Sequence, residues 1–147
     1  KDKNPYQNYY GLKVKHCYEE ISGIDTVLKE EWIDIETVDP ILTEDINSRF
    51  SKQQLLFTDK YFNNSAVSLE FGTPKIVNTA QYRSKYLIIF SEQYTYDAYR
   101  YYSSLNEHIF YQNDPFSQPI NVEGNIKNAF GAFTGRSVKA DTLSFKF

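Results

Sequence analysis

Between Tyr10 and Cys17 the sequence alternates strictly between two sets of positions, and this pattern most constrains the fold. One set is Tyr10, Leu12, Val14 and His16, and the other is Gly11, Lys13, Lys15 and Cys17. Successive side chains of a strand point to opposite faces, so the alternation predicts a half-buried β-strand. A second stretch, Tyr86 to Phe90, is an unbroken apolar run of five residues. It predicts a central strand buried on both faces.

Shorter patterns predict further strands. After the turn-prone Ser22-Gly23 pair, we expect a strand that ends at Asp39-Pro40, because proline cannot donate to a β-ladder. Its residues are Trp32, Ile33, Ile35, Thr37 and Val38. Four more strands are expected at Leu55–Phe57, Ala66–Phe71, Gly131–Phe133 and Thr142–Phe147. In the last of these Leu143, Phe145 and Phe147 should face inward.

One long helix is expected around residues 92–110, with Ser91 as its N-cap. The predicted buried stripe is Tyr94, Ala98, Tyr101, Tyr102, Leu105 and Ile109. Tyr96 and Tyr99 fall outside this stripe and should be exposed. A short helical turn capped by Thr43 is expected between Thr43 and Gln54. The sequence thus predicts a mainly β fold, a β-sandwich or barrel-like sheet with one longer helix. We expect residues 1–147 to form a single domain.

Aromatic residues make up 17% of the chain, with 13 Tyr, 11 Phe and one Trp. Such rings supply core volume, and exposed rings can stack on a carbohydrate or peptide. The rings expected to be available as a ligand platform are Trp32, Tyr96, Tyr99 and Tyr111.

Known catalytic and metal-binding motifs are missing from the sequence. His16 and His108 stand in no HxxxH or HExxH pattern, no serine lies in a GxSxG elbow, and Cys17 is the single cysteine. Catalytic residues, a metal site and a cofactor are therefore not expected. The lack of a Lys/Arg cluster argues against nucleic acid, and no apolar run is long enough to span a membrane as a helix.

Charge is unevenly distributed along the chain, whose net charge is −3. The stretch from Glu19 to Asp45 has ten acidic residues and one basic residue, Lys29. Such a stretch favours either a solvated surface or a face for a cationic partner such as calcium, and the sequence leaves this choice open.

Several short blocks resemble a known family. They are Asp2 with Asn8 to Leu12, Leu55 to Asp59 with Phe62 to Asn64, and then, after the helix, Asp114, Pro115, Phe116, Pro119, Asn125, Ile126 and Gly131 to Phe133. In this order they resemble the C-terminal domain of the Bacteroidota exported lipoprotein family catalogued as domain of unknown function 4249. The resemblance implies a β-rich domain at the C-terminal end of a longer lipoprotein, anchored to the outer membrane by an N-terminal lipid and often encoded beside a TonB-dependent receptor.

The resemblance supplies no catalytic residues. The block after the helix is expected to be structural, with Asp114, Pro115, Phe116, Pro119, Asn125 and Gly131 fixing turns and an extended path. The first functional hypothesis is a non-enzymatic cell-envelope binding or accessory module that serves an outer-membrane receptor. The second is a carbohydrate- or peptide-binding domain that uses the exposed rings. A hydrolase is a third hypothesis that no motif supports.

Overall fold

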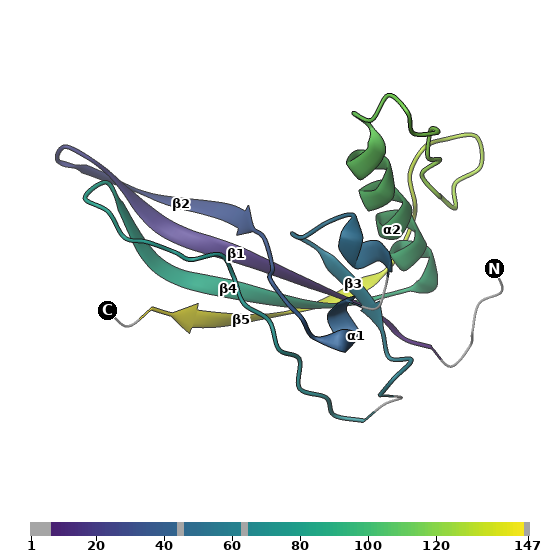
Figure 1. The fold of residues 1–147 in the computed structure, drawn as a ribbon, viewed down its shortest axis with the longest axis horizontal. Helices are drawn as coiled ribbons and strands as arrows, with labels where there is room; N and C mark the ends of the chain where they lie inside the picture. The colour runs from purple at the N-terminus through teal and green to yellow at the C-terminus, as the bar shows by residue number, and fades with distance from the viewer. Residues whose placement is uncertain (1–6, 44–45, 63–64, 146–147) are drawn as a thin grey trace.

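A computed structural model describes residues 7–43, 46–62 and 65–145. The elements are, in chain order, β1 (Tyr9–Ser22), β2 (Asp25–Ile33), the short helix α1 (Pro40–Thr43), the 3₁₀ turn η1 (Ile46–Arg49), β3 (Leu55–Thr58), β4 (Tyr82–Tyr94), α2 (Tyr96–Tyr111) and β5 (Arg136–Ser144). The long strands form an extended, twisted sheet, and α2 stands at one end of it (Figure 1). The predicted mainly β fold with one long helix is confirmed.

The five strands belong to one antiparallel sheet with the order β2-β1-β4-β5. One edge of β1 pairs with β4 over nearly its whole length. The other edge pairs first with β3, at Tyr9 to Leu12, and then with β2, at Val14 to Ser22. The predicted turn at Ser22-Gly23 closes the β1–β2 hairpin, and Gly23 has a positive φ of 63° there.

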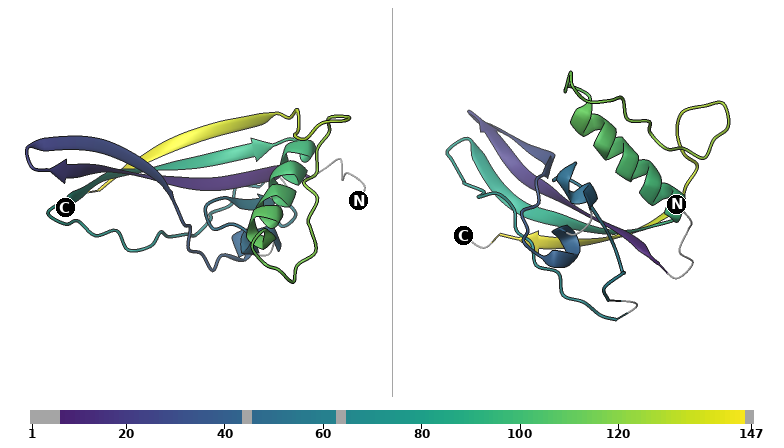
Figure 2. Two further views of the ribbon diagram at one scale, coloured as in Figure 1. Left: turned by 90° about the horizontal axis from the view of Figure 1, so that it is seen from above. Right: turned by 45° about the vertical axis from the view of Figure 1, so that its right-hand side comes forward.

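The core lies on one face of this sheet. Leu12 and Val14 of β1 and Leu87 of β4 are buried beneath the irregular chain between β2 and β4. That chain contributes the buried residues Ile35 and Leu42 and the half-buried Leu69, Phe71 and Ile76, while Leu55 and Phe57 of β3 face the core from the sheet. The second layer is therefore mostly irregular chain rather than a second sheet, as the view along the sheet shows (Figure 2).

Two predicted strands in this layer are wrong. The second strand ends at Ile33, before most of the predicted residues, and Ala66–Phe71 is irregular apart from a single bridge between Glu36 and Gly72 nearby. Side chains bind the backbone where a ladder was expected: Thr37 Oγ1 donates to the Glu70 carbonyl at 2.5 Å, and Asp39 Oδ2 accepts from the Glu70 N–H at 2.8 Å. Asp39 also caps α1, whereas Thr43 is its last residue.

The helix α2 begins at Tyr96 because β4 continues through Ser91 to Tyr94 and stays paired with β1 and β5. Thr95, not Ser91, is the N-cap, and its side chain accepts from the Ala98 N–H. The helix packs on the opposite sheet face from the main core, in a cluster made of Tyr9, Leu56, Tyr94 and Ala98, with Tyr96, Tyr99 and Tyr102 half-buried around it.

The predicted exposure of the helix is therefore partly wrong. Tyr96 and Tyr99 lie against Tyr9, with ring centroids 5.5 and 4.8 Å apart, and are not free rings. Ile109, predicted to be buried, is 50% exposed. The helix sits at the end of the sheet rather than along it, so its last turns have little sheet to cover.

Predictions for the outer strands also need correction. Tyr86–Phe90 lies in the central strand β4, but only Leu87 of this run is buried, so one face of the sheet is partly open. Gly131–Phe133 is irregular, and the last strand is Arg136–Ser144, in which Leu143 is 56% exposed. Phe145 does pack on the core, while Phe147 and the Asn63-Asn64 pair lie outside the described residues.

Candidate functional site

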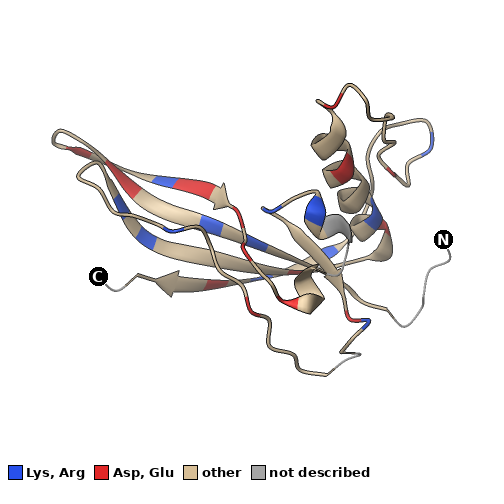
Figure 3. Cartoon of the chain, in the orientation of Figure 1, with Lys and Arg blue, Asp and Glu red and all other residues tan. Residues whose placement is uncertain are grey.

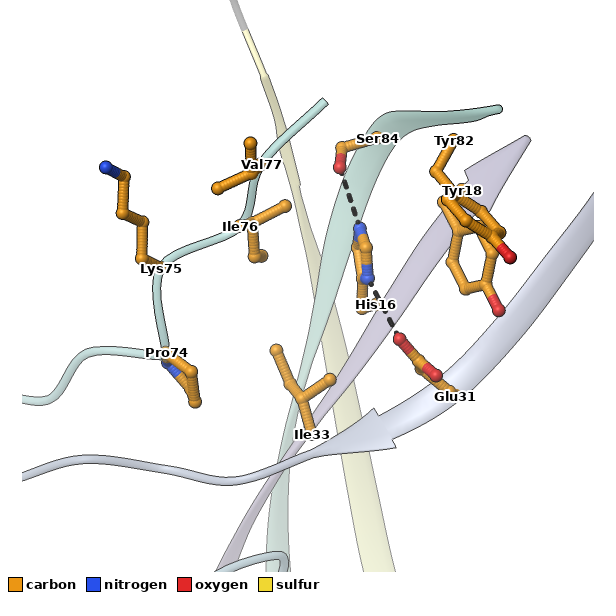
Figure 4. Close-up of a pocket in the computed structure, with 10 residues that line it drawn as sticks. All are labelled: His16, Tyr18, Glu31, Ile33, Pro74, Lys75, Ile76, Val77, Tyr82 and Ser84. Atoms are coloured by element: carbon orange, nitrogen blue, oxygen red, sulfur yellow. Dashed lines mark hydrogen bonds and ion pairs between the residues drawn. The ribbon is translucent and has the colours of Figure 1, made fainter. Parts of the chain in front are cut away.

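A pocket of about 420 Å³ opens on the core face of the sheet, toward the end that carries the β1–β2 hairpin. Strands β1, β2 and β4 form its floor, and the irregular segment 74–77 forms the facing wall (Figure 4). It is lined by His16, Tyr18, Glu31, Ile33, Pro74, Lys75, Ile76, Val77, Tyr82 and Ser84. Mostly apolar walls with a few convergent polar groups are typical of small-ligand sites.

His16 is the central polar residue of this pocket and is 8% exposed. Its Nε2 lies 3.1 Å from Ser84 Oγ, and its Nδ1 lies 3.4 Å from a carboxylate oxygen of Glu31. A carboxylate only accepts, so in the neutral ring Nδ1 donates to Glu31 and Nε2 accepts from the Ser84 hydroxyl. The two contacts fix the ring between β4 and β2, as Figure 4 shows.

Aromatic side chains extend the site away from His16. The ring of Tyr18 stacks on His16 at a centroid distance of 5.1 Å, and Tyr82 meets Tyr18 edge-on at 5.9 Å. Phe145 meets the imidazole edge-on, with a centroid distance of 6.3 Å. The pocket can therefore hold a flat apolar group beside these rings while hydrogen-bonding groups remain at one end.

The rim of the pocket carries one acidic and one basic residue. Glu31 is half-exposed on β2, with 53% of its side chain accessible. Lys75 lies on the facing segment and extends away from His16 (Figure 4). The charges near the polar end of the pocket are thus dominated by Glu31.

The contacts of Ser84, His16 and Glu31 have the order of a serine-hydrolase triad, in which the acid orients histidine and histidine activates serine. Two features weaken this chemistry. Ser84 lies within regular strand β4, and its N–H donates to Asn78 Oδ1 at 2.8 Å, so that this amide is not available to an oxyanion. The 3.4 Å contact to a half-exposed Glu31 also orients the ring weakly.

The four rings predicted as a ligand platform do not come together. Tyr96 and Tyr99 are half-buried against Tyr9, and Tyr111 packs on Phe50 at 5.7 Å. Trp32 lies on β2, is 38% exposed and lines a separate, smaller pocket. None of the four lines the His16 pocket.

The block after the helix forms a loop that is held by side-chain bonds. Asp114 accepts from the Phe116 N–H at 3.0 Å and from the Ser117 hydroxyl at 2.7 Å, which lowers the pKa of its carboxyl. Asn125 donates to the Phe133 carbonyl and accepts from the Phe133 N–H, at 2.8 and 2.7 Å. Gly131 has a φ of 121°, a conformation that favours glycine.

Other residues of this block are exposed. Pro115 and Pro119 lie in exposed chain, and Phe116 is 95% exposed. His108 donates from Nδ1 to the Ile120 carbonyl at 2.9 Å, because a carbonyl only accepts. The His108 side chain therefore joins the loop to α2, and its partner in this bond is a backbone carbonyl rather than a carboxylate.

The acidic stretch 19–45 runs from the end of β1 through β2 and into the chain that follows. Basic residues of the sheet lie beside its acidic residues (Figure 3). Lys15 pairs with Glu30 at 3.0 Å, Lys85 with Glu19 at 3.2 Å, and Lys29 with Glu20 at 3.5 Å. Within the described residues, no three His, Cys, Asp or Glu side chains lie close enough to hold a metal ion. No helix in this part of the chain is long and apolar enough to cross a membrane.

Sequence reasoning missed the His16 pocket because its residues are far apart in the chain. Glu31 and Ser84 lie 15 and 68 positions from His16. The only available signal was the place of His16 on the apolar set of the β1 alternation, which buries it. The hairpin register that sets Glu31 opposite His16, and the β1–β4 register that brings Ser84 near, are tertiary features.

One antiparallel sheet with a long helix at its end and a small, aromatic-lined pocket on one face defines a β-rich domain. The family model described as "Domain of unknown function (DUF4249)" matches residues 1–142. The chain belongs to this family. No curated protein and no solved structure matches it.

Proposed function

We propose that this chain is a non-enzymatic binding module of the cell envelope, which holds a small ligand in the pocket beside His16. The observation that carries this proposal is the pocket itself, about 420 Å³ with largely apolar walls and a fixed imidazole among them. That volume lies within the range of roughly 300–1,000 Å³ that small-ligand sites occupy.

The lining defines the chemistry of the ligand. Ile33 and Ile76 face each other across the pocket, and Tyr82 flanks it, so the ligand has a flat or narrow apolar body (Figure 4). Ser84 and His16 already bond each other, and Glu31 adds an accepting carboxylate. The polar end of the ligand therefore includes a hydrogen-bond donor.

The family resemblance supports the cellular setting of this proposal. The module belongs to a lipoprotein anchored in the outer membrane and serves as an accessory to a TonB-dependent receptor, to which it presents its ligand. The full-length, lipid-anchored protein should recover the receptor encoded beside it in a pull-down from its own cells. Repeated absence of that receptor from the eluate would contradict the accessory role.

The pocket is tested by filling it. Val77 lines the facing wall and is 59% exposed, so Val77→Phe occupies the pocket without disturbing a buried side chain. Val67 lies in the same irregular region, is 40% exposed and lies outside the pocket, so Val67→Phe is the matched control. Ligand that co-purifies with the native protein and its Val67 variant should be lost from the Val77 variant.

A second candidate function, a serine hydrolase, is favoured by the contact chain from Ser84 through His16 to Glu31. In that case a fluorophosphonate probe would label Ser84, and Ser84→Ala would abolish the label. If Ser84 stays unlabelled at probe concentrations that saturate known serine hydrolases, the hydrolase function is excluded and the binding function remains.

A further inference from the structure

A second pocket lies on the opposite face of the sheet, between the end of β2, the irregular chain before β3, and α2. It measures about 280 Å³ and is lined by Lys13, Trp32, Phe50, Ser51, Gln53, Gln54, Asn106 and Ile109. The strand register places Lys13 and Trp32 on this face, since Lys15 of the same β1 face pairs with Trp32. The pocket shares no lining residue with the one beside His16.

Lys13 carries the cationic group of this pocket. Its Nζ lies 4.0 Å from the ring centroid of Trp32, and no acceptor among the described residues pairs with it. Its neighbour Lys15, by contrast, is neutralised by Glu30 at 3.0 Å. Burial lowers the pKa of the Lys13 amine, while the charge of Glu92 opposes this effect. A half-buried ammonium without an ion pair is a favourable partner for an anion.

The nearby carboxylate of Glu92 does not serve Lys13 as a close partner. It is 4% exposed, one oxygen is bonded by the Tyr94 hydroxyl, and the other lies 3.2 Å from Arg136. Arg136 thus balances the charge of Glu92. The local excess of charge at the pocket is the positive charge of Lys13.

Amide side chains supply the remaining polar groups. Gln54 donates to the Tyr94 hydroxyl at 2.9 Å and accepts from Asn106 at 3.3 Å, which holds both amides in place. Gln53 donates to the Trp32 carbonyl at 3.4 Å. Each primary amide has two N–H donors and one carbonyl acceptor, so these bonds leave donors and acceptors for a ligand.

We propose that this pocket binds an acidic sugar, a hexuronic acid residue whose carboxylate pairs with Lys13 and whose ring packs on Trp32 and Phe50. Sugar hydroxyls both donate and accept, which matches the amides of Gln53, Gln54 and Asn106. Apolar C–H faces of the ring match the aromatic side chains. The volume of about 280 Å³ suits one ring rather than a longer ligand.

Trp32 provides the measurement, because it is the only tryptophan of the chain. Methyl β-D-glucuronide should change its fluorescence in a saturable titration. Methyl β-D-glucoside, which has a hydroxymethyl group in place of the carboxylate, should bind at least roughly tenfold more weakly, a difference of about 1.4 kcal/mol. Equal binding of the two sugars, or no saturable change with the glucuronide, would overturn the proposal.

Variants of the two lysines separate the charge of the pocket from that of its surroundings. Lys13→Gln should weaken glucuronide binding by roughly tenfold or more, and Lys13→Arg should retain it. Lys15→Gln is the matched control, because Lys15 lies 4.8 Å from the same ring but does not line the pocket. If both glutamine variants lose binding equally while the fold is intact by circular dichroism, Lys13 is not the anchor.

Two further arms distinguish other outcomes. A short peptide that binds through its C-terminal carboxylate more tightly than the glucuronide would overturn the choice of a sugar. Val77→Phe, which fills the His16 pocket, should leave the glucuronide titration unchanged, so this inference and the proposed function fail independently.

Discussion

Single residues of this chain matter where they allow close packing, and Gly11 is the clearest case. It lies on β1 under the ring of Tyr94, where an added Cβ would come within 2.6 Å of the ring carbon Cε2. Tyr94 cannot easily move, because it is 5% exposed and is bonded by Gln54 and Glu92. The packing of α2 on the sheet therefore depends on the missing side chain at this position.

Gly11→Ala should lower the free energy of unfolding by about 1–3 kcal/mol, since it overpacks this contact. Gly72→Ala is the control, because its added Cβ would meet its nearest atom only at 3.8 Å and its φ is not positive. Urea denaturation of both variants measures the difference. Equal stability of the two variants would show that Tyr94 moves aside freely.

Asp114 illustrates a residue whose charge is held by local bonds. The Ser117 hydroxyl and the Phe116 N–H both donate to its carboxylate and lower its pKa. Ser117→Ala should move that pKa back toward the ordinary value of an aspartate, as followed by carbon-detected NMR of the carboxyl group across acidic pH. An unchanged titration would show that the Phe116 N–H alone sets the pKa.

At the scale of elements, α2 is positioned by its first turn. Thr95 Oγ1 accepts from the Ala98 N–H at 3.3 Å and is also contacted by the Gly135 N–H at 3.4 Å, where the chain returns to β5. This single hydroxyl therefore joins the start of the helix to the entry of the last strand.

Thr95→Ala should cost about 0.5–2 kcal/mol of stability, because the helix loses its N-cap. Thr95→Ser keeps the hydroxyl and should retain most of it. Chemical denaturation followed by far-ultraviolet circular dichroism compares the two. A serine variant as unstable as the alanine variant would assign the effect to the lost methyl group instead.

The elements also show what sequence patterns could and could not predict. The alternation in β1 and the apolar run in β4 correctly located the two central strands, because both are set by burial on the sheet. The prediction of Ser91 as the helix N-cap was wrong because strand pairing through Tyr94 outweighs a local capping preference. The strand predicted at Ala66–Phe71 is absent because Leu69 and Phe71 pack on the core from irregular chain, and the alternation has no partner strand.

The candidate site could be predicted only in part for the same reason. Trp32 was correctly identified as an accessible ring, but the partners that give it a pocket come from the chain before β3 and from α2. His16 was identified only as a residue of an alternating strand. Its bonds to Ser84 and Glu31 depend on strand registers that no local pattern contains.

Tyrosines pack in both hydrophobic clusters of the molecule, and this predicts its response to alkaline pH. Burial raises the pKa of Tyr9, Tyr10 and Tyr94 in the folded chain, and the bond to Glu92 raises that of Tyr94 further. In the unfolded chain these hydroxyls ionise near pH 10. Stability is therefore full below about pH 10 and falls as pH rises above it, because only the unfolded state loses these protons.

The urea midpoint should accordingly stay constant from about pH 8 to about pH 10 and decrease above that. Absorbance of tyrosinate should show that some of the 13 tyrosines ionise only when the chain unfolds. If all of them ionised near their ordinary pKa while the fold persisted, the buried tyrosine clusters would be excluded as the cause.

The binding function itself is tested most directly at His16. The chain has two histidines, so NMR of the imidazole nitrogens reports the pocket through His16 and a distant point through His108, which bonds Ile120. On addition of the small-molecule fraction of the native envelope, the His16 signals should shift and saturate while those of His108 stay in place. Val77→Phe should abolish the shift, and Val67→Phe should not. His16 signals that stay unmoved, or that move equally in the Val77 variant, would contradict the assignment of this pocket as the ligand site.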